Sequence, residues 1–193
     1  MSKNFKPIII VAGQPKSIFF EIFFKAIKSK KTKSPLLIIA SLNILKKYMS
    51  KINSKKKIKL LTLNDLEKIK LNNNNINLID VNFKTKSKKK FELESNYYVK
   101  NSFDVAFKLL KSGFTNKLIN GPINKEKFLK NKFLGVTEYI SNEFKNKNVA
   151  MLIYNKDLSV CPITTHLPLR LVAKNISKKI ICDKVALIHN FYK

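Results

Sequence analysis

Two short runs of aliphatic residues, at positions 7–12 and 36–40, constrain the fold of this chain more than any other feature. Each run is continuously apolar, so a strand formed there has no polar face to turn towards water. Such strands are typical of parallel sheets that are covered on both faces. Between the runs, from Ser17 to about Lys30, the sequence predicts a helix with apolar residues at 18, 19, 22, 23, 26 and 27.

The alternation of strands and helices continues along the chain. Strands are expected at residues 58–63, 76–81 and 117–120, and the polar, lysine-rich residues 82–90 predict a loop. Further helices are expected through Leu42, Leu45 and Met49, after Ser102, near Asn124, after Thr137 and after Ser177. This order indicates an α/β protein with a mostly parallel sheet.

Some local signals refine the expected elements. Ser102, Thr137 and Ser177 can each cap the start of a helix through the side-chain oxygen, and Gly113 suits the end of one. Residues 149–154 and 158–163 are expected to form two adjacent strands of a hairpin, which adds some antiparallel pairing.

The formal net charge of +27 allows two interpretations. A binder of nucleic acid or of an anionic surface would carry such a charge. Such proteins usually rely on arginine, whose planar side chain binds phosphate through two hydrogen bonds. Here the only arginine is Arg170, and the lysines are spread over the whole chain. The composition therefore favours a general lysine bias, with nucleic acid not expected as a partner.

Cysteine content and apolar run lengths indicate the compartment. Cys161 and Cys182 form neither a disulfide framework nor a metal-ligand spacing, and Cys161 is expected in the core. No apolar run approaches the roughly 18 residues that a membrane helix needs. The first residues show no cleavage pattern of a secretory leader. A cytoplasmic protein with reduced thiols and no membrane partner is expected.

Three strand ends carry polar residues, and ligands of α/β sheets bind at such ends. The turn at residues 13–17 has a single glycine and is neither a dinucleotide-binding turn nor a P-loop. Lys125, after the strand expected at residues 117–120, is either a solvated helix start or a contact to a substrate phosphate. Thr137 is either a helix cap or a hydroxyl that binds a ligand. His166 is either a histidine that closes a strand end or a metal ligand or general base.

Four segments, taken in order, carry a family resemblance: residues 7–15, 120–126, 135–139 and 164–170. They resemble the opening strand and turn, the Ala-Pro-Ile-Asn-Lys segment, the Gly-His-Thr-Glu-Phe segment and the Thr-Thr-His-Leu-Pro-Leu-Arg motif of 4-hydroxythreonine-4-phosphate dehydrogenases of the vitamin B6 pathway. The last segment is similar to its motif without a change, and it is the most specific of the four.

The resemblance implies a fold like that of isocitrate and isopropylmalate dehydrogenases, an α/β/α sandwich with a mostly parallel sheet. It also implies NAD- or NADP-dependent oxidation of 4-phosphooxy-L-threonine to 2-amino-3-oxo-4-phosphooxybutanoate, which then loses carbon dioxide to give 3-amino-2-oxopropyl phosphate. A divalent metal (Zn, Mg or Co), held by three histidines in a homodimer, would polarise the hydroxyl.

The resemblance also assigns expected roles to single residues. His166 falls on the first of the metal ligands, Thr137 on a substrate contact, and Lys125 lies in the segment expected to meet the substrate. Val136 stands where the family usually has a substrate-contacting histidine, so the substrate contact or the substrate itself is expected to differ. No catalytic residue and no cofactor contact is assigned.

The resemblance implies that residues 1–193 are the N-terminal part of such a dehydrogenase and that the family's C-terminal segment is absent. This part is expected to be inactive by itself. Two alternatives stay open. One is a related dehydrogenase of another four-carbon phosphorylated hydroxy acid, which Val136 would suit. The other is a non-catalytic basic protein that binds RNA or another anion.

Overall fold

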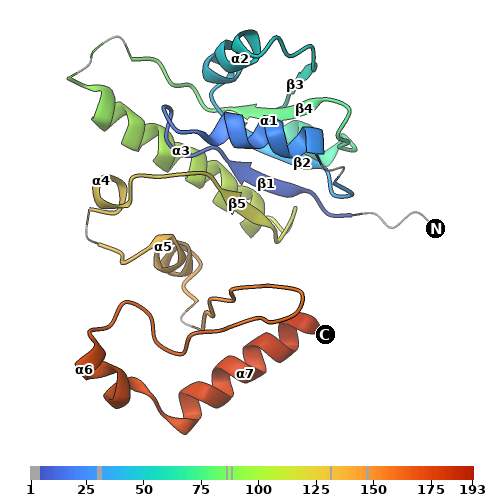
Figure 1. Ribbon diagram of the computed structural model, residues 1–193. Coiled ribbons are helices and arrows are strands. Elements are labelled where there is room, and N and C mark those ends of the chain that lie inside the picture. Colours follow the sequence, from blue (N-terminus) through green and yellow to red (C-terminus); the bar gives the residue numbers. More distant parts are fainter. Residues whose placement is uncertain (1–4, 30–31, 86, 88, 131, 147) are drawn as a thin grey trace. The chain divides into compact units, whose positions relative to one another are not determined.

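The computed structural model describes residues 5–29, 32–85, 87, 89–130, 132–146 and 148–193 (Figure 1). It divides into two compact units, Met1–Phe128 and Leu129–Lys193. Among the described residues, no helix combines the length and the apolar character needed to cross a membrane.

The first unit is built on a five-stranded sheet. Its strands are β1 (Ile8–Val11), β2 (Leu36–Ala40), β3 (Ile58–Leu60), β4 (Ile76–Asp80) and β5 (Leu118–Asn120). Their order is β3-β4-β2-β1-β5, and every pairing within this sheet is parallel. The predicted α/β fold with a mostly parallel sheet is therefore confirmed.

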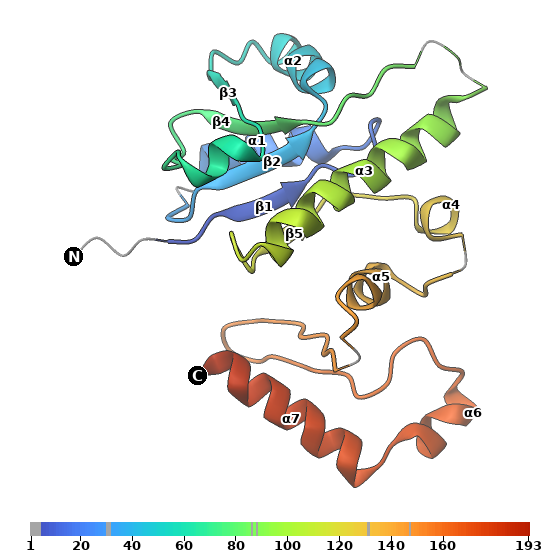
Figure 2. The same cartoon turned by 180° about the vertical axis from the view of Figure 1, so that it is seen from behind.

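Helices cover both faces of this sheet, as the continuous apolar strands require. Helix α1 (Phe19–Ser29) and helix α3 (Phe91–Lys111) lie on opposite faces, as the two views in Figures 1 and 2 show. Helix α2 (Leu42–Lys51) packs beside α1, where Phe20 and Phe24 stack on Tyr48 with ring centroids 6.1 and 5.6 Å apart. The unit also contains the short 3-10 helix η1 (Asn64–Glu67) and helix α4 (Lys125–Leu129), which begins in it.

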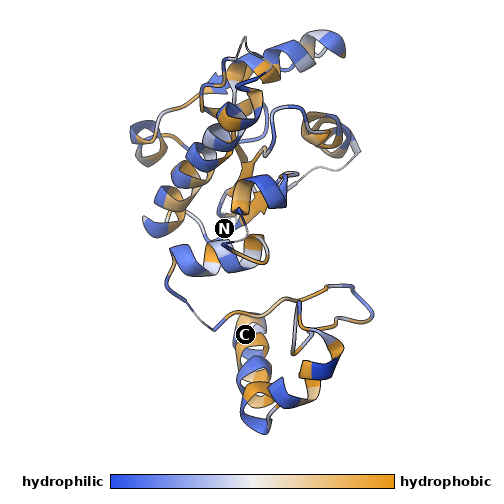
Figure 3. Ribbon diagram, turned by 90° about the vertical axis from the view of Figure 1, so that its left-hand side faces the viewer, coloured by the Kyte–Doolittle hydropathy of each residue, from blue (hydrophilic) through white to orange (hydrophobic). Residues whose placement is uncertain are grey.

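The core of the first unit forms where the strands and these helices meet. Figure 3 shows the strands in the colours of hydrophobic residues. Ile9, Val11, Leu37, Ile39 and Leu78 are fully buried in the sheet. Val99 and Phe103 are the corresponding fully buried residues of α3. The described residues of the predicted loop at 82–90 form no helix or strand, and positions 86 and 88 lie outside the described residues.

Two predictions for the helices need correction. Helix α3 begins at Phe91, twelve residues before the expected first residue Phe103, so Ser102 lies inside the helix and does not cap it. Its buried hydroxyl donates a hydrogen bond of 2.8 Å to the carbonyl of Tyr98, one turn earlier. Helix α1 is present as predicted, but its buried face consists of residues 19, 20, 23 and 24, while Ile18 and Ile22 are exposed.

The second unit is mostly helical and loop. Its elements are α5 (Val136–Glu143), α6 (Leu169–Val172), the 3-10 helix η2 (Ala173–Asn175) and α7 (Lys178–Tyr192). Ser177 caps α7 as predicted, because its Oγ accepts a hydrogen bond of 3.3 Å from the Ile180 amide. Gly135 is the N-cap of α5, so the expected cap role of Thr137 is wrong.

The predicted hairpin of the second unit is reduced to one antiparallel bridge. Ile153 and Val160 exchange two backbone hydrogen bonds of 2.8 and 3.0 Å, and no longer strand is formed on either side of them. Cys161, expected in the core, is only half-buried. Of the described residues in this unit, only Leu129 and Gly135 are buried. The second unit therefore contains little hydrophobic core.

Candidate functional site

The strand order creates a topological switch point between β1 and β5. From β1 the chain moves to β2 and β4 on one side, and it later returns to β5 on the other side. In open parallel sheets, ligands bind in the crevice outside the carboxyl ends of strands at such a point. The segments that leave these two strands are residues 13–17 and 121–125, which are two of the three strand ends that the sequence singled out.

Two glycines let these segments touch. A Cβ atom on Gly13 would lie 2.3 Å from the carbonyl oxygen of Pro122, and one on Gly121 would lie 2.2 Å from that of Ala12. Backbone hydrogen bonds join the same segments, since the Gln14 amide donates to the Pro122 carbonyl at 2.8 Å. Gly13 also has a φ of +79°, which glycine adopts without strain. These glycines therefore serve the contact between two loops rather than the cradling of a phosphate.

A cavity of about 260 Å³ opens beside this contact. The β1 turn contributes Gln14, Lys16 and Ser17, and the first turns of α3 contribute Glu92 and Asn96 among others. The segment after β5 contributes Asn124 and Lys127. The described lining thus combines two ammonium groups, one carboxylate and several amides and hydroxyls. This chemistry suits a small polar ligand that carries charges of both signs.

Interactions among the lining residues hold the cavity in shape. The Lys16 ammonium lies 4.1 Å from the centre of the Phe91 ring, a cation–π contact. Lys127 forms an ion pair with Glu92 and links α4 to α3. The side-chain oxygen of Asn124 accepts a hydrogen bond of 3.1 Å from the Lys127 amide and so caps α4.

One polar atom at this cavity is left without a partner. Asn96 donates from Nδ2 to the Lys127 carbonyl at 3.3 Å, while its Oδ1 is buried and has no hydrogen-bond partner among the described residues. A buried acceptor of this kind is costly unless something donates to it. Asn96 lines the cavity, but its Oδ1 has almost no accessible surface.

The predicted site residues lie in different places. Lys125 is exposed at the start of α4 and does not line the cavity, whereas Asn124 and Lys127 on either side of it do. In the sequence, Asn124 and Lys127 could have been found as an asparagine that caps a helix and a lysine three residues later. Val136 and Thr137 are half-buried neighbours in the first turn of α5, in the second unit.

His166 lies in the loop before α6 of the second unit. Its side chain is exposed and its φ is +58°, so it does not continue a strand, contrary to the expected strand end. Among the described residues, no group of three or more His, Cys, Asp or Glu side chains could hold a metal ion. The donors of this part of the chain do not by themselves fit a catalytic metal, which needs several protein ligands.

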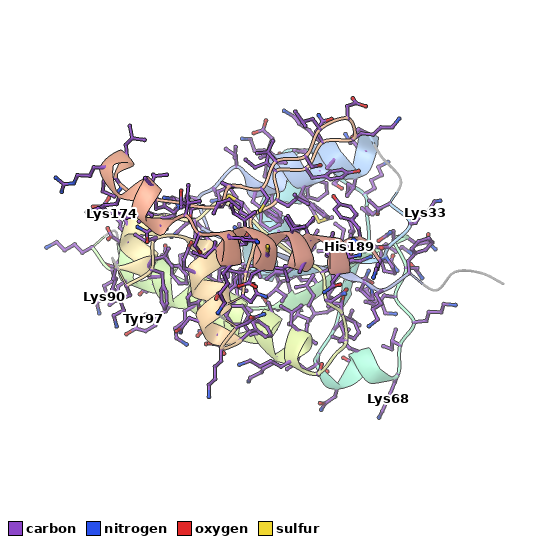
Figure 4. All side chains as sticks on the ribbon, turned by 90° about the horizontal axis from the view of Figure 1, so that it is seen from below. Lys33, Lys68, Lys90, Tyr97, Lys174 and His189 are labelled. Atoms are coloured by element: carbon purple, nitrogen blue, oxygen red, sulfur yellow. The ribbon has the colours of Figure 1, made fainter. Side chains whose placement is uncertain are left out.

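The remaining charged residues are distributed widely. Figure 4 shows Lys33, Lys68, Lys90 and Lys174 on separate segments, and all four are exposed. His189 is exposed on α7. The distribution agrees with a general lysine bias.

Comparison with known proteins identifies what the chain resembles. A family model described as "Pyridoxal phosphate biosynthetic protein PdxA" matches residues 31–193. A 4-hydroxythreonine-4-phosphate dehydrogenase from Sulfurihydrogenibium sp. (strain YO3AOP1) is 32% identical over 190 residues, which cover 96% of this chain. A protein of the same name from Bacteroides thetaiotaomicron is 34% identical over 86 residues, 43% of this chain and 24% of its own.

Solved structures support the fold. A protein from Salmonella typhimurium aligns with a TM-score of 0.80 at 21% identity, over 97% of this chain and 59% of its own. The 4-hydroxythreonine-4-phosphate dehydrogenase of Klebsiella pneumoniae aligns with a TM-score of 0.78 at 19% identity, with the same coverage. The chain spans 58% of the length of the Sulfurihydrogenibium relative.

Proposed function

Because the chain belongs to the family of the pyridoxal phosphate biosynthetic protein PdxA, we propose that it contributes to a dehydrogenase of 4-phosphooxy-L-threonine. The observation that carries the proposal is the family match over residues 31–193. The polar cavity at the switch point of the sheet gives this activity a place for a small charged ligand.

The proposed reaction removes two hydrogens from the secondary alcohol of the substrate. The carbon-bound hydrogen leaves as a hydride, for which NAD or NADP would be the acceptor, and the hydroxyl proton is released. The product is 2-amino-3-oxo-4-phosphooxybutanoate. Loss of carbon dioxide from this 3-oxo acid then gives 3-amino-2-oxopropyl phosphate.

Three residues have proposed roles. The Thr137 hydroxyl would hydrogen-bond the substrate, and Lys125 would meet its phosphate as a point charge. His166 would supply one imidazole to a divalent metal such as Zn, Mg or Co. The described residues offer no group of three His, Cys, Asp or Glu side chains that could hold this metal. Val136, next to Thr137, can neither donate nor accept a hydrogen bond through its side chain.

Val136 supports a second candidate within the same reaction class. An apolar side chain in the first turn of α5 leaves a substrate group beside it without a hydrogen-bond partner. A related four-carbon phosphorylated hydroxy acid that lacks this group would then be the better substrate. We further propose that the enzyme acts as a homodimer in the cytoplasm, the latter supported by two free thiols.

Substrate binding tests the proposed function without requiring turnover. Calorimetry on the full chain is expected to show binding of 4-phosphooxy-L-threonine but not of L-threonine, because the charged phosphate contributes most of the affinity. Equal affinity for the two compounds would sink the proposal. A phosphorylated four-carbon acid that binds at least tenfold more tightly would instead select the second candidate.

A matched pair of variants assigns the phosphate contact. Lys125→Gln and Lys127→Gln remove the same charge from the same helix, but only Lys127 lines the cavity. If substrate binding is weakened about tenfold in Lys125→Gln alone, the proposed role of Lys125 is supported. Weakening confined to Lys127→Gln would move that role to the cavity. Circular dichroism checks that both variants fold, since Lys127 also pairs with Glu92.

A further inference from the structure

A second cavity lies beside the first, at the carboxyl ends of β1, β2 and β4. It has a volume of about 630 Å³, within the range of about 300–1,000 Å³ that is typical of small-molecule sites. Lys16 and Phe91 line both cavities, so these two residues form a shared wall. The other residues that matter for its chemistry are Asn43, Lys47, Phe83 and Thr85. We call this second cavity the lysine groove.

The charges in the lysine groove favour an anion. Its described charged residues are Lys16 from the β1 turn and Lys47 from α2, and no carboxylate belongs to the described lining. The first cavity differs in this respect, because Glu92 contributes a negative charge there. Asn43 and Thr85 add an amide and a hydroxyl that can hydrogen-bond to phosphate oxygens. Two ammonium groups that face one cavity repel each other unless an anion lies between them.

Aromatic rings form the other part of the lining, and they are held in place. The Phe83 ring meets Phe91 edge-on with centroids 5.8 Å apart, and it also contacts Tyr98 at 5.4 Å. Tyr98 is buried, and its hydroxyl accepts a hydrogen bond of 3.0 Å from the Ser41 amide. The rings are thus fixed from behind by the core of the first unit. Fixed aromatic rings favour a flat ring as ligand, by stacking or edge-on contact.

From these features we infer that the lysine groove binds a small phosphorylated compound that carries a single planar ring, at a site separate from those of the proposed substrate and of its dinucleotide cofactor. Lys16 and Lys47 meet the phosphate, and Phe83 and Phe91 contact the ring. 4-Phosphooxy-L-threonine has a phosphate but no ring, so it uses only half of this chemistry. The inference rests on the groove and not on the dehydrogenase activity.

The test uses pyridoxine 5′-phosphate as probe, which has a phosphate and a flat pyridine ring. It lacks an aldehyde, so it does not react with the many lysines of the chain. Calorimetry on the full chain, without substrate, cofactor or metal, is expected to show binding at least tenfold tighter than for pyridoxine or inorganic phosphate. Equal affinity for inorganic phosphate, or no binding of the probe, would overturn the inference.

Neighbouring lysines on α2 provide a matched control. Lys46 and Lys47 are both exposed, but only Lys47 lines the groove. Lys47→Gln should weaken probe binding about tenfold, while Lys46→Gln should leave it unchanged. Equal weakening by both variants would mean that the probe senses only the overall positive charge, and would overturn the site.

The ring contact and the separateness of the site are tested in the same assay. Phe83→Leu keeps an apolar side chain but removes the ring, so it should weaken probe binding about fivefold and leave the weak binding of inorganic phosphate unchanged. Thermal unfolding confirms that this variant folds. Neither excess 4-phosphooxy-L-threonine nor excess NAD or NADP should displace the probe. Displacement would assign the groove to the substrate or to the cofactor, and the separate site would be withdrawn, whether or not the proposed dehydrogenase activity holds.

Discussion

At the scale of single residues, Tyr98 couples the sheet to helix α3. Its side chain is 3% exposed, and burial raises the pKa of its hydroxyl to about 12, from an ordinary value of 10.0. The folded chain therefore keeps the proton more firmly than the unfolded chain does. Stability that depends on the neutral hydroxyl is complete below pH about 10 and is lost as the pH rises towards 12.

This pKa predicts how stability responds to alkali. Over the window between those two values, the free energy of unfolding should fall by about 2–3 kcal/mol through Tyr98 alone. Urea unfolding of the chain and of Tyr98→Phe at several pH values isolates this contribution, because the lysines titrate equally in both proteins. The variant should be less stable near neutrality, since the buried Ser41 amide loses its acceptor. A stability difference that does not shrink as the pH rises would contradict the prediction.

Substitution of three glycines by alanine distinguishes the stability cost of a steric clash from the cost of backbone strain. Gly113→Ala adds a methyl group to open space at a φ of +76° and should cost about 1 kcal/mol. Gly121→Ala meets the backbone of Ala12 and should cost about 1–3 kcal/mol. Gly13→Ala combines both penalties and should cost the most. Urea midpoints give the order, and a Gly113 variant as unstable as the Gly13 variant would refute it.

At the scale of elements, the strands of the parallel sheet were predictable, whereas the edges of the helices and the hairpin of the second unit were not. A continuous apolar run such as residues 36–40 has few alternatives to a strand buried on both faces. The first half of α3 is rich in polar and charged residues, so it carried no clear helical face, and Ser102 resembled a cap. In the folded chain the Ser102 hydroxyl bonds back to its own helix, which allows it to be buried there.

The general position of the candidate site was predictable from the sequence, but the side chains that line it were not. Parallel strands bring their carboxyl ends to one edge, so the turns after residues 12 and 120 were expected near a ligand. Which lysine faces the cavity depends on the pitch of α4 and its cap at Asn124, and the sequence pointed to Lys125. The bend at His166 depends on a positive φ that a non-glycine residue rarely adopts, and the sequence carried no signal for it.

The orientation of α1 yields a prediction about neighbouring side chains. Phe23 is 7% exposed and Ile22 is 53% exposed, although a helical period alone made both candidates for the core. Phe23→Ala should destabilise the chain by about 3–5 kcal/mol, while Ile22→Ala should change its stability by no more than about 0.5 kcal/mol. Chemical unfolding of the two variants checks this, and comparable losses would mean that α1 is rotated from the orientation described here.

At the scale of the whole molecule, the two units differ in whether each can fold stably by itself. The first unit contains all five strands and nearly all of the buried apolar residues, whereas the described part of the second has only Leu129 and Gly135 buried. A fragment of residues 1–128 should therefore unfold cooperatively, and one of residues 129–193 should not. Circular dichroism during thermal unfolding measures both. A sharp transition in the second fragment would show that it has a core of its own.

The exposed apolar residues of α7 predict self-association. Val185 and Phe191 are 60% and 77% exposed, and large exposed apolar surfaces favour contact between molecules. Light scattering should detect oligomers of the full chain, and the double change Val185→Lys and Phe191→Lys should reduce them. The exposed pair Lys178→Gln and Lys179→Gln on the same helix serves as a control for altered charge. A monodisperse monomer before any change would refute the prediction.

The position of β1 also has a consequence for how the chain is made. Ile9 pairs with Leu37 on one side through β2, but on the other side it pairs with Leu118 of β5. At a synthesis rate of about 5–20 residues per second, the nascent chain waits several seconds on the ribosome with one edge of β1 unpaired. An unpaired strand edge that is rich in isoleucine and valine can bind chaperones or pair with other chains in aggregates. The yield of native protein in cells should therefore depend on translation speed between these two strands and on chaperone supply.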